Sequence, residues 1–434
     1  MTIRATINGD HVVVHLRFPA PAANTTNTNR NVKLALLLDT SGSMEGERLN
    51  AVKATLHAAR DAFAEGDEVT LISFSEGATV LLDHHVMTGE GVAAFYAKVD
   101  ALRTDGCTNM GAAFEALAAL DRRDYDAILL LTDGIVNRGV ESTSGLRLMA
   151  NGLGSNQVFN ALGYGADHNR ALLRDLAVHS RGSYTFIDSE SVLPMAIGDI
   201  LSGIRTEVHK CAIMTISEGW TCMEIGGDGP TYKVGNIVGD RSYSVVFKHT
   251  TGDDGTTPVV VKMTAGGFQA DVTAEGGAGP GFTEQIYRCR VANALATAAD
   301  SLERGVVRRE ELTQLQAEMQ AEDEEFRGRP LMLRLMGQVA DLLEQIPVVP
   351  EGAAPPLPAY LTATLSAQMS SGAAVLGLQR GITRTAGGDP VSLFSSPTQR
   401  QVSGATAQRF ASSQAPAVSS DPTDALSVAM ASLV

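Results

Sequence analysis

Two five-residue stretches made wholly of apolar residues limit most strongly what this chain can fold into. Residues 34–38 read Leu-Ala-Leu-Leu-Leu, and residues 127–131 read Ala-Ile-Leu-Leu-Leu. A strand that is buried on one face alternates apolar and polar residues, whereas a strand that is buried on both faces is apolar throughout. Both stretches are therefore expected to be inner strands of a sheet that helices cover on its two faces.

Helical and strand patterns alternate around these stretches. Leu49, Val52 and Leu56 would share one face of a helix, which predicts a helix over residues 47–63. Similar patterns predict strands at 69–74, 79–82, 158–163 and 184–187, and helices at 91–102, 110–120, 170–178 and 191–204. Alternation of this kind is typical of a mainly parallel sheet, so we predict a doubly wound, Rossmann-like α/β domain over residues 31–204.

In the segments on either side of this domain, apolar and polar residues alternate with a period of two. Within residues 1–30, alternating apolar residues flank Asn8-Gly9, which predicts a β-hairpin. Residues 205–280 hold further candidate strands at 209–217, 243–249 and 258–264, as in a small β-sandwich. Because a lone hairpin is only marginally stable in water, we expect the hairpin to join these strands, with the α/β domain inserted between the two parts.

The remaining chain divides into a helical part and a tail. Helical spacing returns in residues 281–348, for example at Leu335, Val339 and Leu342, and predicts a helical hairpin or small bundle that packs as an accessory module. Residues 349–434 are weakly patterned. From Pro390 onward they are rich in Ser, Ala, Gln, Thr and Pro, a composition that predicts a disordered tail.

Composition excludes several classes of protein. A formal charge of −15 argues against binding to nucleic acid and to anionic membranes, which both need clustered Lys and Arg. No apolar run approaches ~18 residues, so we expect no membrane span. The polar N-terminus and four scattered cysteines predict a cytoplasmic protein with free thiols.

The segment Asp39-Thr-Ser41-Gly-Ser43 directly follows the first apolar strand. Ligands of open α/β sheets bind at the carboxyl ends of the strands. A carboxylate and two hydroxyls alternate along this loop, and they form an all-oxygen set that suits a hard cation such as Mg²⁺. Thr108 precedes a predicted helix, and Asp133 follows the second apolar strand, so both are expected at the same edge of the sheet.

With these motifs, the stretch 32–204 resembles a von Willebrand factor type A (VWA) domain, and Asp39-Thr-Ser41-Gly-Ser43 resembles its metal-ion-dependent adhesion site (MIDAS). The resemblance implies that Ser41 and Ser43 coordinate Mg²⁺ (or Mn²⁺ or Ca²⁺) directly. It implies that Thr108 does so directly or through water, and that Asp39 and Asp133 act largely through water. Cys107 stands where this family usually has Gly, which adds bulk beside Thr108.

This metal site predicts a function in binding. Two carboxylates balance a divalent ion, and Mg²⁺ keeps positions for water or ligand. An Asp or Glu of a partner protein would complete the shell, so we expect a Mg²⁺-dependent protein–protein interaction module. Two alternatives stay open at this point: an assembly component of a larger complex or particle whose metal site is idle, and a non-catalytic subunit of a ubiquitin-ligase or AAA+ complex.

The downstream modules resemble those of a group of intracellular VWA proteins, some of which carry a RING or U-box. Four scattered cysteines cannot supply the two zinc sites of a RING. The sequence also has neither a GxxxxGK[ST] phosphate loop nor a GxSxG elbow. We therefore expect a protein that is not an enzyme.

Overall fold

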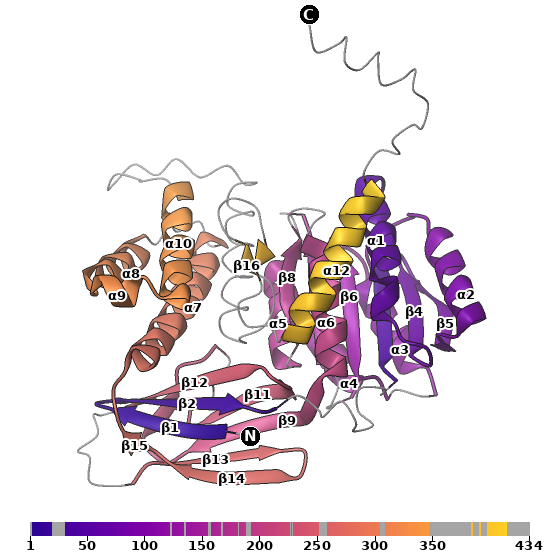
Figure 1. Cartoon of the computed structure of the whole chain (residues 1–434). Helices are drawn as coiled ribbons and strands as arrows, with labels where there is room; N and C mark the ends of the chain where they lie inside the picture. The colour runs from indigo at the N-terminus through magenta and orange to yellow at the C-terminus, as the bar shows by residue number, and fades with distance from the viewer. Residues whose placement is uncertain are drawn as a thin grey trace, which may run out of the picture.

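The computed structural model has three modules, an α/β domain, a β-sandwich and a group of helices (Figure 1). It describes residues 2–19, 31–121, 124–133, 136–154, 158–165, 168–180, 182–187, 192–225, 227, 229–250, 258–303, 309–346, 383–384, 390–391 and 397–414. Within these ranges, no helix is both long and apolar enough to cross a lipid bilayer.

The α/β domain is built on a six-stranded sheet with the order β5-β4-β3-β6-β7-β8. The strands are β3 (Lys33–Asp39), β4 (Glu68–Phe74), β5 (Ala78–Val86), β6 (Ala127–Thr132), β7 (Val158–Tyr164) and β8 (Tyr184–Ile187). Neighbouring strands are parallel except β5, which pairs antiparallel with β4. The predicted doubly wound α/β fold is therefore confirmed, with β3 and β6, which hold the two wholly apolar stretches, side by side in its centre.

Helices cover both faces of this sheet, because successive side chains of β3 point to opposite sides. Leu34, Leu36 and Leu38 belong to one buried cluster with α1, α2 and α6, whereas Ala35 and Leu37 belong to another with α3, α4 and α5. The helices are α1 (Glu47–Ala58), α2 (Gly89–Asp100), α3 (Met110–Ala118), α4 (Thr143–Gly152), α5 (Arg170–His179) and α6 (Val192–Arg205), with short 3-10 turns η1 (Gly42–Met44) and η2 (Ala59–Ala62).

The β-sandwich combines strands from both sides of the α/β domain. One sheet has the order β10-β12-β2-β1-β15 and the other β11-β9-β13-β14. The strands are β1 (Thr2–Asn8), β2 (His11–Arg17), β9 (Glu207–Ile216), β10 (Trp220–Cys222), β11 (Thr231–Val238), β12 (Ser242–His249), β13 (Val260–Ala265), β14 (Phe268–Thr273) and β15 (Glu275–Gly276). Strand β2 pairs along its length with β12, so the N-terminal hairpin lies inside the sandwich.

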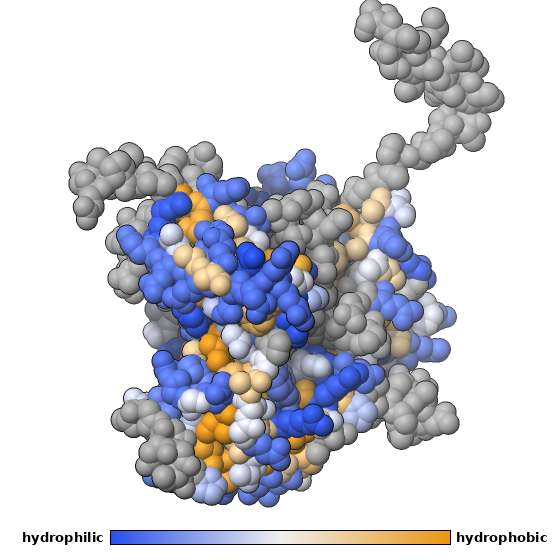
Figure 2. Space-filling view, turned by 60° about the vertical axis from the view of Figure 1, so that its left-hand side comes forward, coloured by the Kyte–Doolittle hydropathy of each residue, from blue (hydrophilic) through white to orange (hydrophobic). Residues whose placement is uncertain are grey.

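The helical module packs on this sandwich. It comprises α7 (Pro280–Glu303), α8 (Glu310–Ala321), α9 (Glu324–Arg327) and α10 (Pro330–Gln345), which share one apolar core. Phe282 and Cys289 of α7 pack against Val13 and Val246 of the sandwich. Figure 2 shows hydrophilic residues over most of the visible face of this module, with apolar residues gathered in a narrower band on the sandwich below it.

Part of the C-terminal region differs from the predicted disordered tail. Residues 397–414 form a helix, α12 (Pro397–Gln414), which lies against α6 and α1 (Figure 1). Val402, Thr406 and Phe410 recur every four residues and are buried or half-buried. The short strands β16 (Thr383–Arg384) and β17 (Pro390–Val391) precede it. The rest of the expected tail lies outside the described residues.

Candidate metal centre

The loop after β3 is held rigidly from both sides. The backbone amide and hydroxyl of Thr40 donate to the Phe74 carbonyl at 2.8 and 3.1 Å. On the other side, Gly42 N donates to the Gly106 carbonyl at 3.0 Å. The turn Gly42–Met44 then inserts the fully buried Met44 into the core. Ser41 and Ser43 therefore have positions that the surrounding backbone determines.

Asp39 is the buried end of β3, with 1% of its surface exposed. Its Oδ1 accepts a hydrogen bond from Ser41 N at 2.9 Å, and its Oδ2 accepts one from the Thr132 hydroxyl at 2.5 Å. Burial raises the pKa of Asp39 to about 6, although these hydrogen bonds oppose the rise; the nearby charge of Asp133 adds to it. A cation bound here would favour the ionised carboxylate.

Three side-chain oxygens form a connected row beside Asp39. The hydroxyls of Ser41 and Ser43 are 3.1 Å apart, and the Ser43 hydroxyl donates to Asp133 Oδ1 at 2.8 Å. Asp133 directly follows β6 and is 5% exposed. Two loops that are distant in sequence thus bring four of the predicted ligands together.

Thr108 comes from a third loop, which the structure attaches to the first. Asp105 N donates to the Thr40 carbonyl at 2.8 Å, and Thr108 N donates to the Asn137 side chain at 2.8 Å. Asn109 accepts a hydrogen bond from Ala112 N and so caps α3 at the predicted start of that helix. Thr108 is buried, but no hydrogen bond between described residues joins its hydroxyl to the other four side chains.

Three residues of this region were not among the predicted ligands. Thr132 orients Asp39, and Asn137 holds the Thr108 backbone. Arg48, in the first turn of α1, places its Nη1 2.5 Å from Asp133 Oδ2 and 3.3 Å from the Ser43 carbonyl. The sequence signal for Arg48 is a single basic residue five positions after Ser43, which local pattern alone does not connect to Asp133.

The donor set fits a hard divalent cation. It contains carboxylate and hydroxyl oxygens, and no nitrogen or sulfur, as Mg²⁺ prefers. Across the described residues, no cluster of three or more His, Cys, Asp and Glu side chains is arranged to hold a metal. The candidate centre therefore depends on its hydroxyls as much as on its carboxylates.

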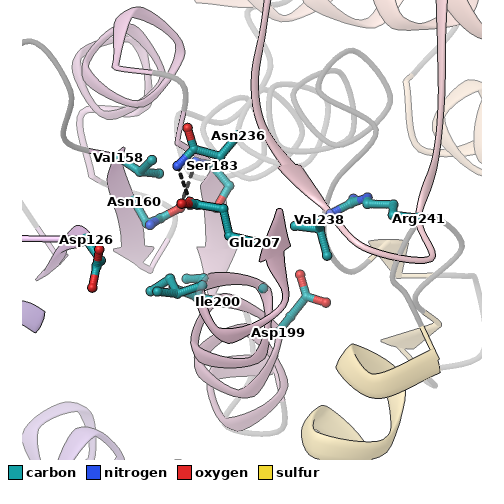
Figure 3. A pocket seen from close by; sticks show the side chains of 12 residues that line it. Asp126, Val158, Asn160, Ser183, Asp199, Ile200, Glu207, Asn236, Val238 and Arg241 are labelled. Carbon is teal, nitrogen blue, oxygen red and sulfur yellow. Dashed lines mark hydrogen bonds between the residues drawn. The ribbon is translucent and has the colours of Figure 1, made fainter. Parts of the chain in front are cut away.

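A small cavity of about 50 Å³ lies elsewhere, at the opposite edge of the sheet (Figure 3). Its lining includes Asp126 and Val158 at the amino ends of β6 and β7, and Glu207 at the start of β9. Asn236 donates to Glu207 within the sandwich. Lys210 of β9 lies 3.1 Å from Asp126, and this pair connects the sandwich to the α/β domain. This cavity is separate from the candidate metal centre.

Residues 34–135 match the family model of the von Willebrand factor type A domain. Two solved structures are similar over most of the chain. A von Willebrand factor type A protein from Catenulispora acidiphila has a TM-score of 0.58 and 17% identity, and covers 88% of this chain and 94% of its own. The ArnB paralog VWA2 from Sulfolobus acidocaldarius has a TM-score of 0.55 and 14% identity, and covers 85% of this chain and 97% of its own.

A curated relative gives a partial match. An uncharacterized protein of Synechocystis sp. is 28% identical over 181 residues, which are 40% of this chain and 42% of that protein. The chain thus spans less than half the length of this relative. The family match shows a VWA domain over residues 34–135, and the two solved structures show a similar fold.

Proposed function

We propose that this VWA domain is a Mg²⁺-dependent module that binds an acidic residue of a partner protein. The observation that carries the proposal is the row of oxygens from Ser41, Ser43 and Asp133, backed by the buried carboxylate of Asp39. When bound there, Mg²⁺ (or Mn²⁺ or Ca²⁺) supplies a positive centre that a partner's carboxylate can approach. The proposal gives the chain no catalytic role.

Each residue of the centre has a distinct task. Asp39 keeps the loop in shape because its two oxygens accept from Ser41 N and Thr132. The Ser43 hydroxyl donates a hydrogen bond to Asp133 Oδ1, which leaves the lone pairs of its oxygen available to a cation. Ser41 lies beside it and offers a second hydroxyl. Thr108, in the adjoining loop, would add a third.

The negative charge of the chain makes the binding of an acidic partner depend on the metal. The chain itself carries a formal charge of −15, so non-specific attraction to other acidic proteins is not expected. A carboxylate would approach this surface only where a local positive charge attracts it. A divalent cation at the end of the central strands supplies such a charge, which makes the interaction depend on the metal.

Asp39→Ala tests this proposal. We expect wild-type protein to gain thermal stability in MgCl₂ relative to EDTA, and to capture a partner in Mg²⁺ that is lost in EDTA, as read by pull-down and mass spectrometry. Asp39→Ala should lose both effects. Asp105→Ala is the matched control, because Asp105 is an exposed carboxylate in the adjoining loop. Partner capture that neither EDTA nor Asp39→Ala reduces would refute the proposal.

The same experiment separates the alternatives. If Mg²⁺ stabilises the protein but does not change which partners are captured, the ion only stabilises the loops. If oligomers or larger assemblies form equally with EDTA, as measured by size-exclusion chromatography with light scattering, an assembly component is favoured. All four cysteines are free thiols, which supports our proposal of a reducing, cytoplasmic setting.

A further inference from the structure

We infer that Arg48 determines the ligand preference of the candidate metal centre, by adding a positive charge that weakens metal binding and strengthens carboxylate binding to the metal-loaded site. The inference rests on the proposed function, and it names a residue that the oxygen motif does not include. It assigns to Arg48 the task of setting the net charge of the site.

Arg48 lies where three loops meet. Its Nη1 contacts Asp133 Oδ2 at 2.5 Å, in the loop after β6, and the Ser43 carbonyl at 3.3 Å, in the loop after β3. A Cβ at Gly165, which follows β7, would lie 3.1 Å from Arg48 Nη2. The guanidinium therefore lies against the bare backbone of Gly165, whose φ of 73° also favours glycine.

The two oxygens of Asp133 face different partners. Oδ1 accepts from the Ser43 hydroxyl, which belongs to the oxygen row, whereas Oδ2 accepts from Arg48. Arg48 thus binds the Asp133 oxygen that does not belong to the oxygen row, and it does not cover the oxygen that faces Ser43. A cation at the serine hydroxyls does not require Arg48 to leave.

Arg48 changes the charge of the loaded site. Asp39 and Asp133 together balance a divalent ion, so the site without Arg48 would be formally neutral. With Arg48 it carries one excess positive charge, and the Arg48 side chain is 37% exposed, so an incoming ligand can reach it. A carboxylate then meets both the ion and a guanidinium, which binds carboxylates well because of its flat array of donors.

The positive charge of Arg48 has opposite effects on the binding of the metal ion and on the binding of the carboxylate. A guanidinium on the far side of Asp133 repels a divalent ion in a water-like medium enough to weaken its binding roughly fivefold. The same charge beside a bound carboxylate strengthens that contact by about threefold to fivefold. If Arg48 had only a structural role, its loss would weaken the binding of both the metal ion and the carboxylate.

The test uses the full chain and two probes, Mn²⁺ and acetate. Mn²⁺ binding is measured by calorimetry, and acetate binding to the Mn²⁺-loaded protein by paramagnetic broadening of the acetate methyl resonance, with acetamide as the neutral control. The variants are Arg48→Met, which removes the charge, and Arg48→Lys, which keeps it. Arg147→Met is the matched control, because Arg147 is 39% exposed and pairs with Asp175 in another part of the domain.

We expect Arg48→Met to bind Mn²⁺ roughly fivefold more tightly and acetate at least threefold more weakly. Arg48→Lys keeps the charge and should therefore keep the Mn²⁺ affinity near wild type, and Arg147→Met should match wild type for both ligands. Loss of both affinities in Arg48→Met, or no change in either, overturns this inference alone. Absence of saturable, Asp39-dependent Mn²⁺ binding in the wild-type protein overturns the proposed function and this inference with it.

Discussion

Arg288 of α7 and Glu224, in the loop after β10, form an ion pair whose two side chains are completely buried. Arg288 Nη1 donates to Glu224 Oε2 at 2.9 Å, and Val246 N of the sandwich donates to Glu224 Oε1 at 3.0 Å. Arg288 also donates to the Ser244 carbonyl. The pair therefore joins the helical module to the sandwich through one closed set of hydrogen bonds.

Arg288→Met should destabilise the protein by about 3–5 kcal/mol, because it leaves the buried carboxylate of Glu224 without its counter-charge. Urea unfolding followed by fluorescence measures the change in unfolding free energy. Arg290→Met, two residues further on the same helix, is the control, since its pair with Glu318 is partly exposed to solvent and should contribute about 0–1 kcal/mol. Equal effects of the two substitutions would contradict the special role of the buried pair.

Removing the charge of Asp39 should change the pH dependence of stability. Burial raises the pKa of Asp39 to about 6 from the ordinary 3.8, so without metal the folded state loses stability as pH rises between these values. The loss is about 3 kcal/mol. In EDTA, Asp39→Asn should therefore gain stability relative to wild type from pH 4 to pH 7. A difference that is constant over this range would exclude the effect.

Stabilisation by Mg²⁺ should also depend on the ionisation of Asp39, but it should increase as pH rises. The ion binds the ionised carboxylate, so protons compete with it below the pKa of about 6. We expect the shift of the melting temperature caused by MgCl₂ to be large at pH 7.5 and to shrink as pH falls through 6. Asp39→Asn supplies the control, in which MgCl₂ should cause no shift at either pH.

Thr132→Val should destabilise the candidate centre, and it leaves the side-chain volume nearly unchanged. It removes the hydroxyl that donates to Asp39 Oδ2, a hydrogen bond to a charged group worth about 1.5–3 kcal/mol. We expect the unfolding free energy to fall at pH 7, and to fall less at pH 4, where Asp39 is protonated. Thr185→Val makes the same change at a buried position of β8 and should show no such dependence on pH.

Helix α12 should detach from the α/β domain when Phe410 is shortened. Phe410 is 5% exposed on a helix that otherwise carries mostly small and polar residues, so it supplies much of the apolar contact with the rest of the domain. Phe410→Ala should cost the docked state about 3 kcal/mol and reduce amide-exchange protection of residues 397–414 on the order of a hundredfold. Gln408→Ala, on the exposed side, should leave the protection unchanged.

Short-range pattern predicted the α/β domain and the neighbourhood of its candidate centre. Apolar runs marked the inner strands, and the parallel pairing of Leu38 with Leu131 sets Asp39 beside Thr132, as expected when polar residues follow two adjacent parallel strands. Helix α4 was missed, because Leu146 is its one buried residue in the described segment and a single apolar residue makes no period. Strands β10 and β15 were missed because they have only three and two residues, and β11 was missed because Gly235 interrupts its pattern. Strand β14 was missed although its residues alternate between apolar and polar.

The sequence by itself therefore determined the class of the fold and the types of oxygen ligands available to a cation, because both follow from local periodicity and from where strands end. Tertiary structure alone decided that Arg48 holds Asp133, that Thr132 orients Asp39 and that α12 lies against α1 and α6. These contacts join residues that are distant in sequence, and they depend on rotamers and on the meeting of loops. No spacing rule along the chain encodes them, so only the folded arrangement could identify Arg48 as a further part of the candidate metal centre.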